Sequence, residues 1–320
     1  MHYDLTGKRI WVAGHLGMVG GAVVRRLEQE NCEIITAGRD IVDLVNQKEV
    51  HDWMAANRPD AIILAAAKVG GVHANNTYPV DFLYENLMIE ANIIHAAHEA
   101  DVGRVLFLGS SCIYPKFAEQ PILENSLLTG PLEPTNEWYA IAKIAGIKLI
   151  QAYRKQYGRD WISAMPTNLY GPGDNYDLDN SHVLPALLRK FHEAKERGEK
   201  EVVVWGTGSP LREFMHCEDL ADALVFLMKN YTGYEHVNVG SGCEVTIKEL
   251  AEKIAVIVGY NASITWDTSK PDGTPRKIMD SRLLKKLGWD NSRCLEKGIM
   301  STYLQWTTQT KNNYQSANRK

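Results

Sequence analysis

The chain has 320 residues, 45% of them hydrophobic, and a formal net charge of −4. This length and apolar content allow one large core or two smaller ones, as in a two-part globular enzyme. No dense stripe of lysine and arginine is present to neutralise nucleic-acid phosphates, and no apolar run is long enough to span a membrane. We therefore expect neither a nucleic-acid nor a membrane partner. The N-terminus lacks a basic stretch followed by an apolar one, which favours a cytoplasmic protein.

The five cysteines are odd in number, widely separated and free of any C-x-x-C pair. A disulfide framework uses paired cysteines, and a zinc site needs closely spaced ligands. We therefore expect no disulfide framework and no metal site. Any special cysteine must be special by its chemistry.

The first half of the chain alternates short β-rich runs with helical stretches. Strands are predicted for the β-rich runs at residues 9–13, 33–36, 61–65 and 105–108. Helices are predicted where apolar residues recur at helical spacing, at residues 19–30, 47–57 and 83–100. Such a βαβ series builds a parallel sheet with helices on its faces through right-handed crossovers. The sequence therefore predicts an α/β fold with a doubly wound parallel (Rossmann) sheet over residues 1–170.

From residue 171 the pattern changes to a loop rich in Gly, Pro, Asn and Asp, followed by a predicted helix at 183–198. We expect residues 171–320 to form mainly a smaller α/β substrate-binding domain. Within it, a segment at about 211–245 is expected to return to the first domain. The polar tail after Trp306 has a composition compatible with disorder.

A glycine-rich stretch follows the first predicted strand and opens the first predicted helix. It has the form G-x-x-G-x-x-G and consists of Gly14, His15, Leu16, Gly17, Met18, Val19 and Gly20. Glycines at such a turn let backbone N–H groups approach a dinucleotide pyrophosphate at a helix N-terminus. A glycine turn without a ligand is the alternative, which the strand before and the helix after disfavour.

The end of the second predicted strand distinguishes the two nicotinamide cofactors. An acid at that tip holds the ribose 2′-hydroxyl of NAD, whereas a cation holds the 2′-phosphate of NADP. Here no acid stands at the tip and Arg39 lies just beyond it, which favours NADP(H). Asp40, twenty residues after Gly20, leaves NAD open, and a solvated loop charge is the alternative role of Arg39.

A tyrosine and a lysine stand four residues apart in Tyr139-Ala140-Ile141-Ala142-Lys143, and therefore on one face of a helix. The lysine can lower the phenol pKa, and a phenol so placed exchanges a proton with a carbonyl oxygen during hydride transfer. Ser110 and Ser111 come at the carboxyl end of a predicted strand, the edge where parallel sheets bind ligands. A hydroxyl there can hold the same carbonyl oxygen.

Taken together, the glycine stretch, Ser110, Tyr139 and Lys143 resemble the pattern of the extended short-chain dehydrogenase/reductase family, whose triad is Ser or Thr, Tyr and Lys. Five segments extend the likeness over nearly the whole chain: AAAKVGGVHANNTYP (65–79), FLGSSCIYPK (107–116), EPTNEWYAIAKIAGIKL (133–149), PTNLYGPGDN (166–175) and SKPDGTPRK (269–277). These segments are similar to the epimerase/reductases of the family that act on a GDP-linked sugar. The resemblance implies NADP(H) as cofactor and GDP-4-keto-6-deoxy-D-mannose as substrate, which is inverted at C3 and C5 and reduced at C4.

The resemblance also implies acid–base roles for Cys112 and His182. Both inverted carbons flank the C4 ketone, so loss of their protons gives an enolate that Ser110 and Tyr139 can stabilise. Each inversion needs a base on one face of the sugar and an acid on the other, and these are the family roles of Cys112 and His182. A thiol is a base only as thiolate, so we expect cations such as Lys143, together with the cofactor motif, to lower its pKa. The alternatives are a small buried hydrophobe for Cys112 and a loop or capping histidine for His182.

The remaining contacts follow from the same resemblance. Besides the glycine stretch, the expected cofactor contacts are Arg39, Asp43, Leu44, Leu108, Gly109, Ser110, Lys143, Pro166, Asn168, Leu169 and His182. The expected substrate contacts are Lys190, Trp205, Arg212 and Asp272. Core packing for Trp205, a solvated charge for Lys190 and a turn cap for Asp272 are the alternatives. Two long helices, around 83–100 and 138–157, imply a homodimer by pairing across a two-fold axis.

Two other functions remain open at this point. One is another nucleotide-sugar epimerase or reductase with the same triad. Related 4,6-dehydratases carry an Asp-Glu pair just after the triad hydroxyl, whereas Ser111, Cys112 and Ile113 of this chain offer no carboxylate there. Simple 4-epimerases have no use for the thiol. The other is a non-catalytic dinucleotide-sensing protein of the same fold, although such proteins commonly lack the tyrosine and lysine that are present here.

Overall fold

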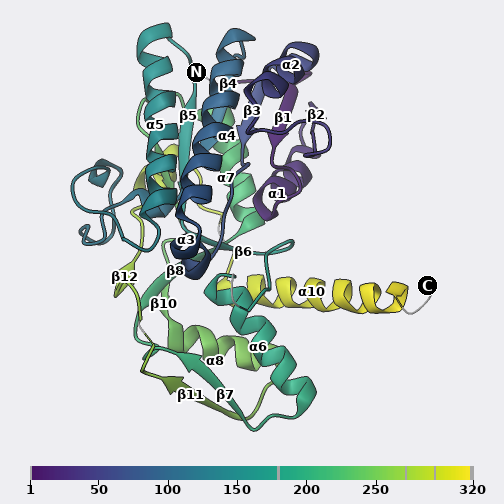
Figure 1. Cartoon of the computed structure of the whole chain (residues 1–320), viewed down its shortest axis with the longest axis vertical. Helices are drawn as coiled ribbons and strands as arrows, with labels where there is room; N and C mark the ends of the chain where they lie inside the picture. The colour runs from purple at the N-terminus through teal and green to yellow at the C-terminus, as the bar shows by residue number, and fades with distance from the viewer. Residues whose placement is uncertain (1, 179–180, 271, 292, 318–320) are drawn as a thin grey trace.

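The computed structural model describes residues 2–178, 181–270, 272–291 and 293–317. A six-stranded parallel sheet forms the centre of the upper part of the molecule (Figure 1), with the strand order β2-β1-β3-β4-β5-β9. The strands are β1 (Arg9–Ala13), β2 (Glu33–Ile35), β3 (Ala61–Leu64), β4 (Arg104–Leu108), β5 (Ile162–Pro166) and β9 (Val237–Val239). The chain reverses its direction of travel across the sheet between β1 and β3, which opens a ligand-binding crevice at the carboxyl ends of the strands.

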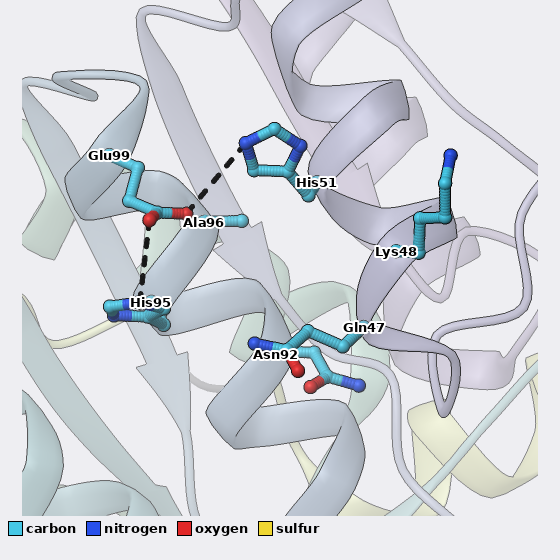
Figure 2. Close-up of a pocket in the computed structure, with 7 residues that line it drawn as sticks. All are labelled: Gln47, Lys48, His51, Asn92, His95, Ala96 and Glu99. Carbon is cyan, nitrogen blue, oxygen red and sulfur yellow. Dashed lines mark ion pairs between the residues drawn. The ribbon is translucent and has the colours of Figure 1, made fainter.

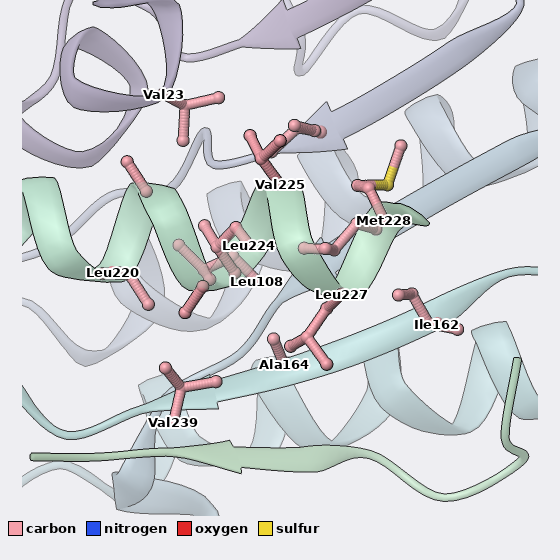
Figure 3. Packing of buried hydrophobic residues seen from close by; sticks show 14 of the residues in the cluster. Val23, Leu108, Ile162, Ala164, Leu220, Leu224, Val225, Leu227, Met228 and Val239 are labelled. Carbon is pink, nitrogen blue, oxygen red and sulfur yellow. The ribbon is translucent and has the colours of Figure 1, made fainter. Parts of the chain in front are cut away.

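One face of this sheet is covered by α1 (Met18–Leu27) and α7 (Cys217–Asn230). Figure 3 shows Val23 of α1 and Leu224 of α7 in the apolar cluster that also contains Leu108 of β4. All three side chains are buried. The second half of the chain therefore completes the core of the first.

The other face is covered by α2 (Gln47–Asn57), α4 (Pro79–Glu99) and α5 (Glu137–Tyr157), with the short α3 (Val72–Thr77) leading into α4. Helices α4 and α5 lie side by side (Figure 1) and pack closely on each other. Because both faces of the sheet are covered, the central strands β3 and β4 are buried along their whole length rather than at alternate residues.

The lower part of the molecule in Figure 1 is built around α6 (Val183–Arg197) and α8 (Ile247–Val258). One parallel pair joins β7 (Glu201–Trp205) and β11 (Ser263–Asp267). A second small sheet joins β10 (Glu244–Thr246), β8 (Leu211–His216), β12 (Arg276–Lys277) and β6 (Asn168–Tyr170). The remaining elements are the 3-10 turns η1 (Ser111–Ile113) and η2 (Glu124–Ser126), and α9 (Arg282–Leu287) and α10 (Leu295–Ala317). Segment 211–245 links the two parts, because β8 and β10 belong to the lower sheet whereas α7 and β9 belong to the upper one.

The tail is helical as far as Ala317, so the prediction of disorder after Trp306 is wrong for this part, and residues 318–320 lie outside the described residues. Trp306 of α10 stacks on Tyr176, with ring centroids 4.8 Å apart. The hydroxyl of Thr307 donates to the carbonyl of Tyr303, one turn earlier in the same helix. Composition alone misses this because the aromatic contact that anchors the helix joins residues 130 positions apart.

Within the described ranges, no helix is both long enough and apolar enough to cross a membrane. The same residues contain no group of three His, Cys, Asp or Glu side chains placed to hold a metal ion. All five cysteines are free thiols.

The core contact of α7 gives a test of the packing. Leu224→Ala should lower the free energy of unfolding by about 2 to 5 kcal/mol, because it leaves a cavity in a fully buried cluster. Val256→Ala on α8 is the control, since the Val256 side chain is 78% exposed and its removal should have little effect. Urea unfolding followed by circular dichroism measures both. Equal losses for the two variants would contradict the packing described here.

Candidate active site

The carboxyl ends of the parallel strands bring the predicted site residues to one edge of the sheet. Gly14 follows β1, Ser110 follows β4 and Pro166 ends β5. Because β1, β3, β4 and β5 are successive parallel neighbours, these ends lie along the same edge. The sheet topology therefore brings the glycine stretch and the triad serine together.

The glycine stretch forms a tight turn in which Gly14 and Gly20 leave no room for a side chain. Gly14 has φ +90°, and a Cβ atom there would lie 2.7 Å from the Ala66 backbone. A Cβ atom at Gly20 would lie 2.0 Å from the Gly14 carbonyl oxygen. Gly17 caps α1 without any side-chain hydrogen bond, which leaves N–H groups of the first turn to a ligand. The buried Nδ1 atom of His15 also lacks a hydrogen-bond partner. These features fit a bound dinucleotide.

The segment after β2 lies at the surface. Arg39 is exposed, and the structure gives it no ion pair within the described part of the chain. Asp43 is exposed and accepts a hydrogen bond from the backbone of Val45, while Leu44 is partly buried against α2 and α4. Arg39 therefore remains available to an anionic group of the cofactor, as its prediction requires.

Ser110 and Cys112 stand on one turn at the end of β4. Ser110 precedes η1, and its hydroxyl oxygen accepts a hydrogen bond from the Cys112 backbone N–H at 3.4 Å. Leu108 and Gly109 connect β4 to this turn, and a Cβ atom at Gly109 would lie 2.3 Å from the Met165 sulfur. The close fit at Gly109 fixes the position of the turn relative to β5.

The phenol of Tyr139 lies beside this turn. Burial raises the pKa of Tyr139 well above its usual value, the charges of Cys112 and Glu90 raise it further, and hydrogen bonding with Ser110 lowers it. Burial, rather than the lysine charge considered from the sequence, therefore sets the direction of the shift. Tyr139 is a neutral phenol at neutral pH, which is the form that donates a proton.

Lys143 lies one turn beyond Tyr139 on α5 and is buried. Its ammonium group donates to the Leu108 carbonyl at 3.1 Å and lies 2.9 Å from a carboxylate oxygen of Glu90. The same nitrogen lies 5.8 Å from the centre of the Tyr139 ring. The structure thus brings the predicted triad of serine, tyrosine and lysine together and adds a buried acid, Glu90, that the sequence did not single out.

The thiol of Cys112 is 6% exposed. Burial raises its pKa, and the charge of Lys277, hydrogen bonding with Ser110 and the charge of Lys143 act in the opposite direction. The expectation that nearby cations lower this pKa overall is therefore wrong, because loss of solvation outweighs them. Cys112 is a protonated thiol at neutral pH.

Lys277 is a site residue that the sequence did not identify. It ends β12, which pairs with β8 so that Lys277 lies opposite Arg212. Burial lowers the pKa of Lys277, and Cys112 raises it. Its only sequence signal was its place in the SKPDGTPRK segment, because the contact with Cys112 joins positions 165 residues apart.

His182 caps the N-terminus of α6 without a side-chain capping bond. Its pKa is lowered, first by loss of solvation and then by the charge of Lys277, although much of the side chain remains exposed. His182 is therefore a neutral imidazole at neutral pH, able to accept a proton. Lys277 influences both His182 and Cys112, which indicates that the second half of the chain reaches the triad.

Three cofactor positions lie between the sheet and the lower part of the molecule. Pro166 ends β5, and Asn168 and Leu169 begin β6. The Asn168 side chain donates to the Glu213 carbonyl at 2.8 Å, and Leu169 packs against the core of the upper sheet. Their cofactor roles stay predictions.

Two of the predicted substrate residues lie at β7. Trp205 is 67% exposed, so the core alternative is wrong, and the Lys270 ammonium lies 5.4 Å from the centre of its ring. Lys190 of α6 donates to the Val203 carbonyl, and burial lowers its pKa. Lys190 is therefore tied to the backbone of β7 rather than fully solvated.

The other two, Arg212 and Asp272, lie near each other. Burial lowers the pKa of Arg212, and the charge of Asp272 opposes this shift. Asp272 accepts hydrogen bonds from the backbone and hydroxyl of Thr207 at 2.7 and 2.8 Å. Asp272 thus ties its own loop to the loop after β7, and it lies near Arg212.

A polar surface cavity of about 270 Å³ lies elsewhere, between α2 and α4 (Figure 2). In it Glu99 lies between two histidines, with its carboxylate 3.9 Å from His51 and 3.5 Å from His95. No residue that lines this cavity belongs to the predicted site.

Comparison with known proteins agrees with this geometry. The NAD dependent epimerase/dehydratase family matches residues 10–240. Putative GDP-L-fucose synthase 2 of Arabidopsis thaliana is 61% identical over 92% of this chain and 90% of its own length. GDP-L-fucose synthase of Escherichia coli (strain K12) is 55% identical over 94% of this chain and 97% of its own length.

A crystal structure of a GDP-L-fucose synthetase from Naegleria fowleri bound to NADP superimposes with a TM-score of 0.89. It covers 97% of each chain at 28% identity. The resemblance drawn from the sequence motifs is therefore confirmed. With its sheet order, its glycine turn and its Ser-Tyr-Lys triad, this chain belongs to the NAD dependent epimerase/dehydratase family.

Proposed function

We propose that this protein is a GDP-L-fucose synthase that converts GDP-4-keto-6-deoxy-D-mannose to GDP-L-fucose with NADPH. The observation that carries the proposal is the η1 turn, which holds Ser110 and Cys112 beside Tyr139 and Lys143. Relatives of this name, 55 to 61% identical over most of the chain, support it. So does the free Arg39 beyond β2, which is suited to the 2′-phosphate of NADP(H).

The reductive step uses the triad. NADP(H), held at the glycine turn, supplies the hydride that reduces the C4 ketone. Ser110 holds the ketone oxygen, and the neutral phenol of Tyr139 donates the proton that turns this oxygen into a hydroxyl. The phenolate left behind lies next to the Lys143 ammonium and regains its proton from solvent.

The two inversions use the same oxygen as the electron acceptor. Removal of the proton at C3 or C5 leaves an enolate whose charge collects on O4, which Ser110 and Tyr139 stabilise. Cys112 and His182 form the acid–base pair on the two faces of the sugar. Starting from the states of the free protein, the imidazole accepts the proton removed from one face and the thiol donates a proton to the other face. This leaves an imidazolium and a thiolate, and Lys277 stabilises the thiolate. These two groups act as acid and base in the second inversion, which restores the starting states.

Substrate contacts come from the lower part of the molecule. The guanidinium of Arg212 is suited to a diphosphate, and the exposed face of Trp205 to a guanine ring. The free thiols fit the reducing cytoplasm, where we place the enzyme. Residues 1–170 bind the cofactor and the later part mainly binds the sugar nucleotide.

The reaction is tested with purified protein, GDP-4-keto-6-deoxy-D-mannose and NADPH in deuterated water. NADPH absorbance should fall and the sugar product should carry deuterium at C3 and C5. NADPH loss without this label would indicate a simple 4-reductase. Binding of NADPH without any turnover of sugar would favour a dinucleotide sensor, and both results would contradict the proposal.

Cys112→Ser should sharply reduce deuterium exchange at the sugar while NADPH binding remains intact. Lys277→Met removes a cation whose charge lowers the pKa of the thiol, so the pKa of Cys112 should rise further and the pH at half-maximal exchange should move upward. Lys277→Arg keeps the charge, so its pH at half-maximal exchange should stay close to that of the wild-type protein. Exchange by Cys112→Ser at the wild-type rate would remove the thiol from the mechanism.

We also infer a homodimer through α4 and α5. Their outer faces carry four apolar side chains that are 37 to 72% exposed, on α4 Val80 and Tyr84 and on α5 Trp138 and Ile141. The helical spacing of each pair places it on one face of its helix. A second copy related by a two-fold axis would cover both faces.

Small-angle scattering should give twice the chain mass for the wild-type protein. The double variant Val80→Glu/Ile141→Glu places charges in the proposed contact and should shift the mass towards that of the monomer. Val256→Glu, a charge on an exposed position of α8, is the control and should remain dimeric. A monomeric wild-type protein at micromolar concentration would refute the dimer.

A further inference from the structure

A buried carboxylate lies beside the catalytic lysine and has no part in the reaction steps above. Glu90 of α4 and Lys143 of α5 are each 2% exposed, and their charged atoms lie 2.9 Å apart. In the part of the chain that the structure describes, Glu90 is the only acid that forms an ion pair with Lys143. Among the described residues, the ammonium also faces the Leu108 carbonyl and the rings of Phe107 and Tyr139, none of which carries a negative charge in the free protein.

The packing of α4 on α5 builds this pair. Phe82 meets the edge of the Tyr139 ring, with centroids 6.5 Å apart, and two turns further along α4 Glu90 meets Lys143. A Cβ atom at Gly146 would lie 2.6 Å from a Glu90 carboxylate oxygen. The absence of a side chain at Gly146 therefore leaves room for the carboxylate between the helices.

The ion pair with Lys143 is the interaction that accounts for the burial of Glu90. Among the described residues, neither of its carboxylate oxygens has another hydrogen-bond partner. Burial raises the pKa of Glu90, and Lys143 opposes this shift. A buried ammonium is equally unfavourable without a counter-ion, because loss of solvation favours its neutral form. The pair therefore gives each buried group its counter-ion.

We propose that Glu90 is a positioning residue of the active site, whose carboxylate fixes Lys143 against the Leu108 carbonyl and keeps its ammonium group charged beside Tyr139. The proposal rests on the proposed function only in taking Tyr139 and Lys143 as catalytic. The other groups that face Tyr139 are Ser110 and Cys112, and Lys277 acts through Cys112.

Glu90→Gln tests the proposal, because glutamine keeps the shape and removes the charge. At about pH 8 the unpaired ammonium should lose its proton, so kcat for NADPH oxidation should fall about tenfold or more relative to wild type. At about pH 6 the proton returns, and most of the difference should disappear. Glu90→Asp keeps a negative charge and should retain part of the activity at the higher pH.

Gln151→Leu is the matched control, since it removes another buried polar side chain of α5 that lies away from the triad. Its pH profile should keep the wild-type shape. If Glu90→Gln also keeps that shape while wild type turns over the sugar, Glu90 is not a positioning residue and the proposed function stands.

A measurement without substrate separates the two proposals. In Glu90→Gln, Lys143 should lose its proton at a lower pH in the folded chain than in the unfolded chain. Between these two pH values the unfolded chain binds more protons, so the stability of the variant rises with pH. The loss of Tm relative to wild type should therefore be greatest near pH 6 and smaller near pH 9. A loss that is the same at both pH values would overturn the role of Glu90. An inactive wild type would overturn the proposed function alone.

Discussion

The packing of α5 against the end of β4 is the contact on which the active site depends. Small residues let the helix approach the sheet: a Cβ atom at Gly146 would lie 2.4 Å from the Phe107 ring of β4. This close approach lets the Lys143 ammonium reach the Leu108 carbonyl, and it places Tyr139 beside the turn that begins after Gly109. A bulkier helix face would hold the tyrosine and the lysine too far from the strand end.

Burial at this contact gives the site its chemical character. Burial there raises the pKa of Cys112 and of Tyr139, and loss of solvation together with Lys277 lowers the pKa of His182 at the start of α6, so each of these three groups is neutral in the free protein. Neutral groups can exchange protons with a substrate without first losing a hydration shell. The cations Lys143 and Lys277 stabilise negative charge that develops later, on the sugar oxygen or on the sulfur.

The second half of the chain completes the site through one strand. Alternate residues of β8 point to opposite sides, so Arg212 and Glu213 have different tasks. Glu213 is fully buried and accepts hydrogen bonds from the backbone of Gly242 and Met279, which joins β8 to the neighbouring loops. Arg212 lies opposite Lys277 in the register of β12. The strand that anchors this part of the molecule therefore also pairs with β12, whose Lys277 acts on the thiol.

Local patterns in the sequence determined several helices and strands and the motifs of the site. The helix at 47–57 and the strand at 9–13 match the structure residue for residue, and the glycine stretch and the Tyr139/Lys143 spacing identified the family and the triad. Such features are encoded within a few consecutive residues, where periodicity and backbone freedom are visible. The helix that continues after Trp306 was not visible in this way, because an aromatic contact of Trp306 with Tyr176 anchors it.

Only the tertiary structure decided the electrostatics. The ion pair of Glu90 with Lys143 joins residues 53 positions apart, and the charge of Lys277, held by the pairing of β12 with β8, acts on Cys112. The direction of the thiol pKa also depends on the balance of burial against these cations. Sequence motifs carry no information on solvation, so the motifs predicted the pKa of the Cys112 thiol in the wrong direction.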